Sequence, residues 1–338
     1  MRLLSLDVLR TIAVFLVLAV HAEWMPIHGG WIGVDLFFVL SGFLVGGLLF
    51  RELKTTGGLR PARFLVRRAW KIYPAFYALM AFTVLFTWLE GNRLLTTANV
   101  VSELLFLTNY AGKLWGHTWS LAVEEHFYLL LPFLAPAKRF PLMVFAVACV
   151  CLAARLVTPW PDAYFYTHTR IDALFFGALL AWAYYNRPEF KVLALKYRPV
   201  LAIAGMALIS TAFVWDHNEV RWMQTVGVTL QYLGAGALVA AAVAKEWQPN
   251  KITQALAWVG THSYSIYLWH LAVRFWFVPA LGEWPKEVQT VLYYGLSIAF
   301  GISMAKLVEA PFLKLRDYFD AKPVSVNDRP VAVLVSRG

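Results

Sequence analysis

The chain has 338 residues, of which 60% are hydrophobic and only 15% are charged, whereas an ordinary soluble domain carries about 25% charged residues. Its mean hydropathy is +0.58, and its formal net charge is +10, from 30 Lys and Arg against 20 Asp and Glu. This composition excludes a disordered chain, a coiled coil and a small disulfide scaffold, and it favours a polytopic membrane protein whose apolar surplus faces lipid.

Apolar runs long enough to cross a bilayer recur along the whole chain. A spanning helix needs roughly 20 apolar residues, and about ten runs meet this requirement. The stretch 98–110 is apolar but short, which predicts a re-entrant or interfacial helix or part of an eleventh span. The predicted fold is therefore all-α, a polytopic transmembrane helical bundle, with a membrane domain over 1–311 and a short cytoplasmic tail over 312–338. The ten predicted spans are 7–25, 32–50, 72–89, 119–136, 140–157, 170–186, 199–215, 222–244, 253–272 and 287–307.

The distribution of Lys and Arg predicts the orientation of these spans. If the N-terminus is cytoplasmic, the segments on that side carry 22 of the 30 basic residues, the opposite loops carry five, and three lie in or at the ends of spans. An excess of basic residues is typical of cytoplasmic loops. Both termini are therefore expected in the cytoplasm, and the net charge needs no nucleic-acid partner.

The first predicted span carries three ionisable residues, which within a membrane are by default hypotheses for function. Asp7 and Arg10 stand three residues apart, so we expect them to meet on one helix face. Arg10 and His21 stand eleven residues apart, within about 20° of three full turns and about 16 Å along the axis. They should share a face, with Arg10 near the cytoplasm and His21 in the outer half. Alternatively, the ion pair is structural and His21 only caps the helix.

The second span and the loop after it add further charged residues. Asp35 begins this span, where its carboxylate either complements the helix dipole or has a functional role, and Gly42 is expected to let a neighbouring helix approach closely. Arg63, Arg67 and Lys71 follow at i, i+4 and i+8, which predicts a basic stripe on one helix face. The stripe suits positive-inside topology and anionic lipid headgroups, or alternatively the phosphates of an anionic cofactor.

Other ionisable residues lie at the ends of later spans. Glu124 starts a group of two carboxylates and one imidazole at the outer start of the fourth span. This layout suits a cytoplasmic anionic donor and an outer polar acceptor. It suits metal binding poorly, because no His, Cys or carboxylate group has compact ligand spacing. The outer set is Asp35, Glu124, Arg170, Asp172 and His270, with His21 behind it, and the inner set is Arg10, Arg67, Arg68 and Lys71.

Seven motifs follow one another along the chain. They are Leu6-Asp7 with Arg10 and His21, the run from Gly33 to Phe43, Arg67-Arg68 with Ile72-Tyr73-Pro74, Trp119-Ser120-Leu121 with Glu124 and Phe127-Tyr128, Arg170-Ile171-Asp172-Ala173-Leu174 with Gly177, the run from Tyr264 to His270, and Glu309-Ala310-Pro311. Together and in this order they resemble acyltransferase family 3, a family of integral membrane acyltransferases, many of which O-acetylate cell-surface glycans. Lys71 departs from the family pattern, which usually has Arg there; Lys keeps the charge and loses the bidentate fork.

The resemblance implies a reaction and a set of site residues. Acetyl-CoA or another acyl-CoA would deliver its acyl group from the cytoplasmic side to a hydroxyl of a cell-surface glycan or lipid-linked sugar. His21 would be the catalytic general base or a transient acyl carrier, and Glu124 would orient His21 or bind the acceptor. The donor is expected at Arg10, Arg67, Arg68 and Lys71, and the acceptor at Asp35, Arg170, Asp172 and His270.

The expected partners are the acyl-CoA, the acceptor and membrane lipids, with no metal and no nucleic acid; a homo-oligomer is left open. The expected location is the bacterial cytoplasmic (inner) membrane. A transporter of a small anionic or sugar-like solute would also use intramembrane Arg, His and Glu, although the inverted repeats typical of transporters are not visible. Two further functions fit the same residues: an acyl-CoA sensor without turnover, and an acyltransferase that acts on a small glycosylated metabolite such as a macrolide.

Overall fold

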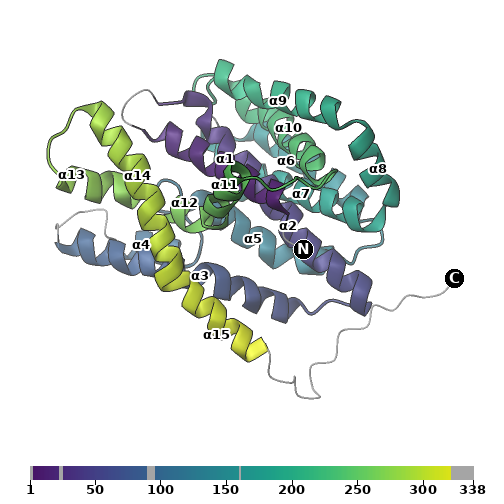
Figure 1. Ribbon diagram of the computed structural model, residues 1–338, viewed down its shortest axis with the longest axis horizontal. Coiled ribbons are helices and arrows are strands. Elements are labelled where there is room, and N and C mark those ends of the chain that lie inside the picture. Colours follow the sequence, from purple (N-terminus) through teal and green to yellow (C-terminus); the bar gives the residue numbers. More distant parts are fainter. Residues whose placement is uncertain (1–2, 23–25, 90–95, 160, 321–338) are drawn as a thin grey trace.

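The computed structural model describes residues 3–22, 26–89, 96–159 and 161–320. Every regular element within these ranges is a helix or a helical turn, which confirms the all-α prediction (Figure 1). The elements in chain order are α1 (Leu4–Val20), η1 (His28–Trp31), α2 (Ile32–Thr56), α3 (Pro61–Leu89), α4 (Thr97–Leu104), α5 (Trp119–Leu134), α6 (Phe140–Val157), η2 (Asp162–Tyr164), α7 (Thr167–Asn186), α8 (Pro188–Lys196), α9 (Arg198–Val214), η3 (Met223–Gly227), α10 (Val228–Val243), α11 (Lys251–Thr261), α12 (Ser263–Ala272), η4 (Val273–Phe277), α13 (Val278–Ala280), α14 (Lys286–Met304), η5 (Ala305–Glu309) and α15 (Ala310–Asp320).

Several of these helices suit a membrane interior, and the protein is an integral membrane protein. Five helical stretches in the described ranges are long and apolar enough to cross a bilayer, and α8 with α9 would make a sixth although the pair bends by 77°. The described residues of the ten predicted runs lie almost entirely in helices. The count of ten spans and the cytoplasmic position of both termini stay predictions. The five stretches are His28–Thr56, Pro61–Leu89, Phe140–Val157, Met223–Val243 and Lys286–Asp320.

Three predicted elements differ in detail from the structure. The run 98–110 forms only the eight-residue α4 followed by turns, which is too short for a span. The run 253–272 is divided at His262 into α11 and α12. Helix α1 already ends at Val20, with His21 at its C-cap, and residues 23–25 of the predicted first span lie outside the described residues.

Tertiary contact with α1 accompanies the separation of α11 from α12. Thr11 Oγ1 in α1 donates a hydrogen bond to the Leu256 carbonyl in α11 (2.5 Å). Gly260, one turn further along α11, lies so close to the backbone of Asp7 that a Cβ atom there would overlap its carbonyl oxygen. Helix α11 is therefore placed by its crossing with α1, while α12 packs against α14.

Helices α2 and α7 cross at close range. A Cβ atom on Gly42 would overlap the carbonyl of Leu174, and one on Gly177 would overlap the carbonyl of Val39. Small residues at such crossings let two helix backbones approach each other in membranes. The prediction that Gly42 permits a close approach is confirmed.

Two buried ion pairs join α2, α6 and α7. Arg170 Nη2 lies 2.8 Å from Asp35 Oδ1, and Arg155 Nη1 lies 2.9 Å from Asp172 Oδ2. All four side chains have no solvent exposure. The Arg170 guanidinium also lies over the ring of Tyr164, 4.2 Å from its centroid. Because each charge is paired with an opposite charge, the three helices can bury these four ionised side chains in the interior of the bundle.

The C-terminal helices form one helical stretch that reaches the predicted basic stripe of α3. Helix α14, η5 and α15 follow one another without a break from Lys286 to Asp320, and Asp320 pairs with Arg67 of α3. The predicted boundary between 311 and 312 falls inside this stretch. Residues 321–338 of the predicted tail lie outside the described residues, and the division into a domain and a tail stays a prediction.

Candidate functional site

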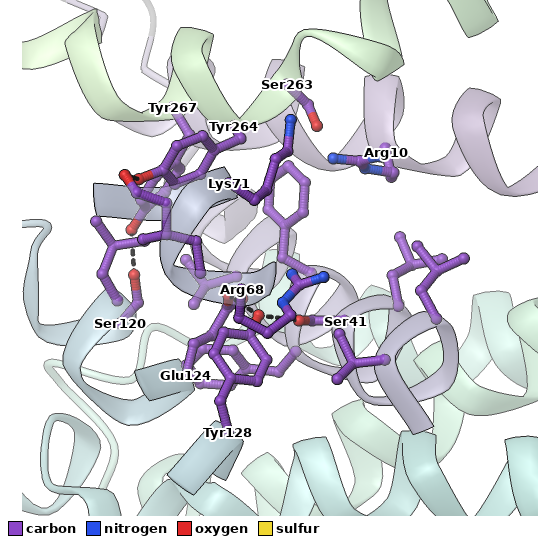
Figure 2. A pocket seen from close by; sticks show the side chains of 18 of the residues that line it. Arg10, Ser41, Arg68, Lys71, Ser120, Glu124, Tyr128, Ser263, Tyr264 and Tyr267 are labelled. Carbon is purple, nitrogen blue, oxygen red and sulfur yellow. Dashed lines mark hydrogen bonds between the residues drawn. The ribbon is translucent and has the colours of Figure 1, made fainter. Parts of the chain in front are cut away.

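A cavity of about 270 Å³ opens between α1, α2, α3, α5 and α12. Its apolar wall comes mainly from α2, through residues such as Phe37, Phe38 and Leu44. Its polar side chains converge from the other four helices and from Ser41 (Figure 2). We call it the cationic cavity, since three of its polar residues are basic. These polar residues are Arg10, Ser41, Arg68, Lys71, Ser120, Glu124, Tyr128, Ser263, Tyr264 and Tyr267.

Two of the three cations are held by ion pairs, Arg10 within its own helix and Lys71 with a residue of η5. Arg10 Nη1 lies 3.8 Å from Asp7 Oδ1, which confirms the predicted contact within α1. Lys71 forms an ion pair with Glu309 of η5, and Glu309 also accepts a hydrogen bond from Ser265 Oγ (3.0 Å). These bonds fix the cations at one side of the cavity and leave its apolar wall facing them.

Glu124 lies in the same cavity at the end of a chain of hydrogen bonds. The Tyr128 hydroxyl donates to Glu124 Oε2 (2.6 Å), and Ser41 Oγ lies 2.7 Å from the Tyr128 hydroxyl (Figure 2). Because the Tyr128 proton goes to the carboxylate, Ser41 is the donor in the second bond. The Arg68 guanidinium lies 4.8 Å above the Tyr128 ring, and the charges of Arg68 and Arg10 both act on the carboxylate. Glu124 therefore interacts with Arg68 and Arg10 through its charge, and with Arg68 also through the ring of Tyr128.

A second cavity continues from the cationic cavity towards the end of α2. It has a volume of about 510 Å³ and shares Arg68 and Lys71 with the first. Arg63 and Arg67 line it as well, which confirms that the predicted basic stripe lies on one face of α3. Arg67 Nη1 pairs with Asp320 Oδ2 (2.6 Å). Of the four predicted donor-binding residues, Arg67 therefore faces only this second cavity.

His21 lies away from Glu124, in a row of three imidazole rings that we call the histidine row. The His270 ring centroid lies 5.0 Å from that of His21 and 5.0 Å from that of His117. Arg10 lies in the first half of α1 and His21 at its C-cap, about 16 Å apart along the helix axis. In the described part of the chain, the hydrogen bond of Glu124 goes to Tyr128 and not to His21.

Each ring of the histidine row donates one N–H to a backbone carbonyl. His21 Nδ1 donates to Val17 (2.9 Å), His270 Nδ1 to Tyr267 (2.5 Å) and His117 Nε2 to Leu268 (3.1 Å). In a neutral ring the other nitrogen is then a proton acceptor. His270 Nε2 and His117 Nδ1 are buried and have no hydrogen-bond partner among the described residues. The row therefore places two imidazole nitrogens that can accept a proton in the buried interior.

Tyr267 connects the histidine row to the cationic cavity. It lines that cavity, and its ring lies 5.5 Å from His117 and 5.6 Å from His270. Its hydroxyl donates to the His117 carbonyl (3.0 Å) and lies 2.5 Å from Ser120 Oγ. Burial lowers the pKa of His117, in the loop before α5, to about 3, so this ring stays neutral at physiological pH.

The sequence prediction did not include His117. The sequence feature that could have identified His117 is its place two positions before the Trp119-Ser120 motif. The helix pattern puts it in a loop, where an ionisable residue is expected to be exposed. The loop is buried only because α12 packs against it, where Leu268 accepts the His117 N–H. Tyr267 lies in the motif from Tyr264 to His270, and the resemblance assigns no role to its side chain.

The other predicted acceptor residues lie elsewhere. Asp35, Arg170 and Asp172 form the buried ion pairs of α2, α6 and α7, and none of them lines the cationic cavity. Their role in acceptor binding stays a prediction. No group of three or more His, Cys, Asp or Glu among the described residues is arranged to hold a metal ion, and this includes the histidine row.

Comparisons with known proteins agree on one family. A family model described as an acyltransferase domain matches residues 3–306. Peptidoglycan O-acetyltransferase OatA of Listeria monocytogenes is 28% identical over 92% of this chain and 56% of its own length. O-acetyltransferase OatA of Staphylococcus aureus is 27% identical over 80% of this chain and 50% of its own length. The chain thus spans about half the length of these curated relatives. No solved structure matches it.

Proposed function

Because this chain belongs to the acyltransferase domain family and is an acyltransferase of the membrane, we propose that it moves an acetyl or other acyl group from an acyl-CoA to a hydroxyl of an extracytoplasmic glycan or glycolipid. One observation carries the proposal: a cationic cavity is joined through Tyr267 to a row of three imidazole rings that ends at His21. The first suits an anionic donor, and the second suits proton transfer from a hydroxyl.

The donor fits the cationic cavity and its continuation. Phosphate oxygens suit guanidinium forks and ammonium groups, so the phosphates of acyl-CoA would bind near Arg67, Arg68 and Lys71. The apolar wall of α2 suits the long pantetheine arm, which would run towards Tyr267. Arg10, on the same cavity, would hold the thioester end. The Lys and Arg bias of the sequence favours a cytoplasmic position for this side, and the cytoplasmic (inner) membrane of a bacterium for the protein.

The chemistry would take place at His21. Its Nδ1–H bond to Val17 fixes the tautomer in which Nε2 accepts a proton. As the acceptor hydroxyl attacks the thioester carbonyl, its proton passes to His21 Nε2. The new C–O ester bond forms, the C–S bond breaks, and the thiolate of CoA leaves and takes the proton back from the imidazolium. If His21 carries the acyl group instead, its Nε2 attacks the thioester carbonyl, the C–S bond breaks and the CoA thiolate leaves. The acceptor hydroxyl then attacks the acyl-imidazole, the C–N bond breaks as the C–O ester bond forms, and the hydroxyl proton passes to the thiolate of CoA.

His270 and Glu124 would support this step from two sides. His270 lies beside His21 and would keep the acceptor hydroxyl oriented. Glu124 would hold Arg68 and Arg10 in place for the donor through Tyr128 and its own charge. This assignment replaces the expectation that Glu124 orients His21, because its hydrogen bond goes to Tyr128.

A labelling experiment tests the proposal. Purified protein in detergent is incubated with acetyl-CoA labelled in the acetyl group, and the released CoA and protein-bound label are measured. General acid–base catalysis is worth about 10²–10⁴-fold, so His21→Gln should release CoA at least about 100-fold more slowly. His262→Gln is the matched control, because His262 Nδ1 also donates to the carbonyl four residues before it (2.8 Å).

The outcomes separate the candidate functions. Label held covalently by the wild type and lost in His21→Gln would favour the acyl-carrier route over the general-base route. Wild-type rates in His21→Gln would remove His21 from the mechanism. A folded wild-type protein that neither binds acetyl-CoA nor releases CoA would contradict the donor assignment and favour a transporter.

A further inference from the structure

A third cavity lies on the far side of His21 from the cationic cavity. It has a volume of about 120 Å³ and is formed by His21 together with residues of η4, α13 and α14. One water molecule needs roughly 10–15 Å³ on this measure, so the cavity has room for a ligand group of several heavy atoms. Helix α13 and the start of α14 lie at the upper left of Figure 1, whereas α15 and the N-terminus lie lower in the view. We call it the outer cavity.

Three polar side chains of the outer cavity suit a hydroxylated ligand with a negative charge. Arg274 brings a guanidinium to the wall from the π-helical turn η4, a distortion that is frequent at functional sites. The Tyr293 side chain is buried, at 3% exposure, and its hydroxyl has no hydrogen-bond partner among the described residues. Gln289 Nε2 donates to the Trp284 carbonyl (2.7 Å). This bond fixes the orientation of the side-chain amide, whose oxygen Oε1 can accept a hydrogen bond.

The position of His21 links this cavity to the reaction. His21 lines the outer cavity on one side and contacts His270 of the histidine row on the other. The charge of Arg274 acts on both rings and on Tyr293. A hydroxyl group that reaches His21 from the outer cavity would therefore have a guanidinium close by, and any group attached near that hydroxyl would meet it.

From this arrangement we infer that the outer cavity is the acceptor subsite, and that Arg274 selects acceptors carrying a carboxylate or phosphate near the hydroxyl that is acylated. The inference rests on the proposed function and names the class of acceptor. The Tyr293 hydroxyl and the Gln289 amide would bind neighbouring polar groups of a sugar. A hydrogen bond between a guanidinium and an anion is roughly twice as strong as a neutral one, so the charge decides the preference.

Three small sugars of different charge test the inference. Release of CoA from acetyl-CoA by the purified protein is measured with methyl β-D-glucuronide, glucose 1-phosphate or methyl β-D-glucopyranoside as acceptor. We expect one of the two anionic sugars to be preferred over the neutral glucoside by about 10-fold or more in kcat/KM; which one is preferred tells carboxylate from phosphate. In Arg274→Gln this preference should fall to about 1.

The preference is a ratio within one protein preparation, so it does not depend on the amount of active enzyme. Arg221→Gln is the matched control: Arg221, in the helical residues just before η3 and on the predicted outer side, donates to the Leu156 carbonyl (3.0 Å) and lines none of the three cavities described here. It should keep the wild-type preference. No preference in the wild type, stimulation by none of the sugars, or a preference that survives Arg274→Gln would each overturn the inference. Hydrolysis of acetyl-CoA in the absence of any sugar that is lost in His21→Gln would show that the proposed donor and the role of His21 stand even where the acceptor inference fails.

Discussion

The pair of Asp35 and Arg170 offers the sharpest test of how charges are used inside this bundle. The sequence comparison with family 3 implied that both residues face the acceptor, whereas the structure pairs them at 2.8 Å with no exposure of either side chain. We predict that Asp35→Asn and Arg170→Met each destabilise the protein strongly, because either change leaves one buried charge without its partner. Such a change costs about 3–5 kcal/mol.

The surroundings of the pair refine this magnitude. When Asp35 is neutralised, the Arg170 guanidinium keeps the Tyr164 ring at 4.2 Å, and a cation–π contact is worth about 0.5–2 kcal/mol. Asp35→Asn should therefore lie at the lower end, near 3 kcal/mol. Arg170→Met leaves a carboxylate without such a neighbour and should cost more. The double variant removes both charges, so it should be more stable than the sum of the two single changes predicts, by about 2 kcal/mol or more.

Thermal unfolding in detergent, followed by the fluorescence of a thiol or tryptophan reporter, measures these effects. The single variants should unfold about 5–10 °C below the wild type, and the double variant should recover part of the difference. Asp317→Asn is the control, since Asp317 pairs with Arg316 at the surface with 63% of its side chain exposed and such pairs contribute little. Additive losses in the double variant would refute the ion-pair reasoning. Loss of transfer activity at unchanged unfolding temperature would restore the acceptor-binding role.

Three further predictions follow from other contacts. Tyr128→Phe removes the hydrogen bond to Glu124 (2.6 Å); since a bond to a charged group is worth about 1.5–3 kcal/mol, kcat/KM for acetyl-CoA should fall by at least about 10-fold. Gly42→Leu should prevent α2 from packing on α7 and abolish the folded, monodisperse protein, which size-exclusion chromatography would show; a folded Gly42→Leu protein would contradict the close crossing. In a cysteine-free background, cysteines at Thr55 and Glu283 should react with a membrane-impermeant maleimide from opposite sides of the membrane, and labelling of both from one side would reject the predicted orientation.

Much of the fold was readable from the sequence because burial in lipid demands long apolar runs. The described residues of the ten predicted runs lie almost entirely in helices. The division at His262 was not predicted, because the apolar pattern continues through it, whereas the close contact of Gly260 with the backbone of α1 is tertiary. The bend between α8 and α9 falls at the start of the predicted run 199–215, and a periodic pattern carries no information on the direction of a helix axis.

The candidate site was predicted in part. Arg10, Arg68 and Lys71, three members of the predicted inner set, line one cavity, and Glu124, which the sequence placed in the outer set, lines the same cavity. Arg67, next to Arg68 in the chain, faces another cavity because successive residues on a helix point about 100° apart. The separation of His21 from Glu124, and the burial of His117, depend on which helices lie side by side. That information is not contained in the spacing of residues along the chain.

The sequence separation of the partners sets the order in which the two buried ion pairs can form during synthesis. Arg155 and Asp172 stand 17 residues apart and Asp35 and Arg170 stand 135 apart. At about 5–20 residues per second of synthesis, the first pair is completed within roughly 1–3 s, whereas Asp35 precedes its partner by roughly 7–27 s. The buried charges of the α6–α7 hairpin thus sum to one positive charge once Arg155 and Asp172 have met, and α2 holds the buried negative charge of Asp35. Asp35 therefore has no partner until α7 has been made, and the ion pair that joins α2 to α7 is completed after the one that joins α6 to α7.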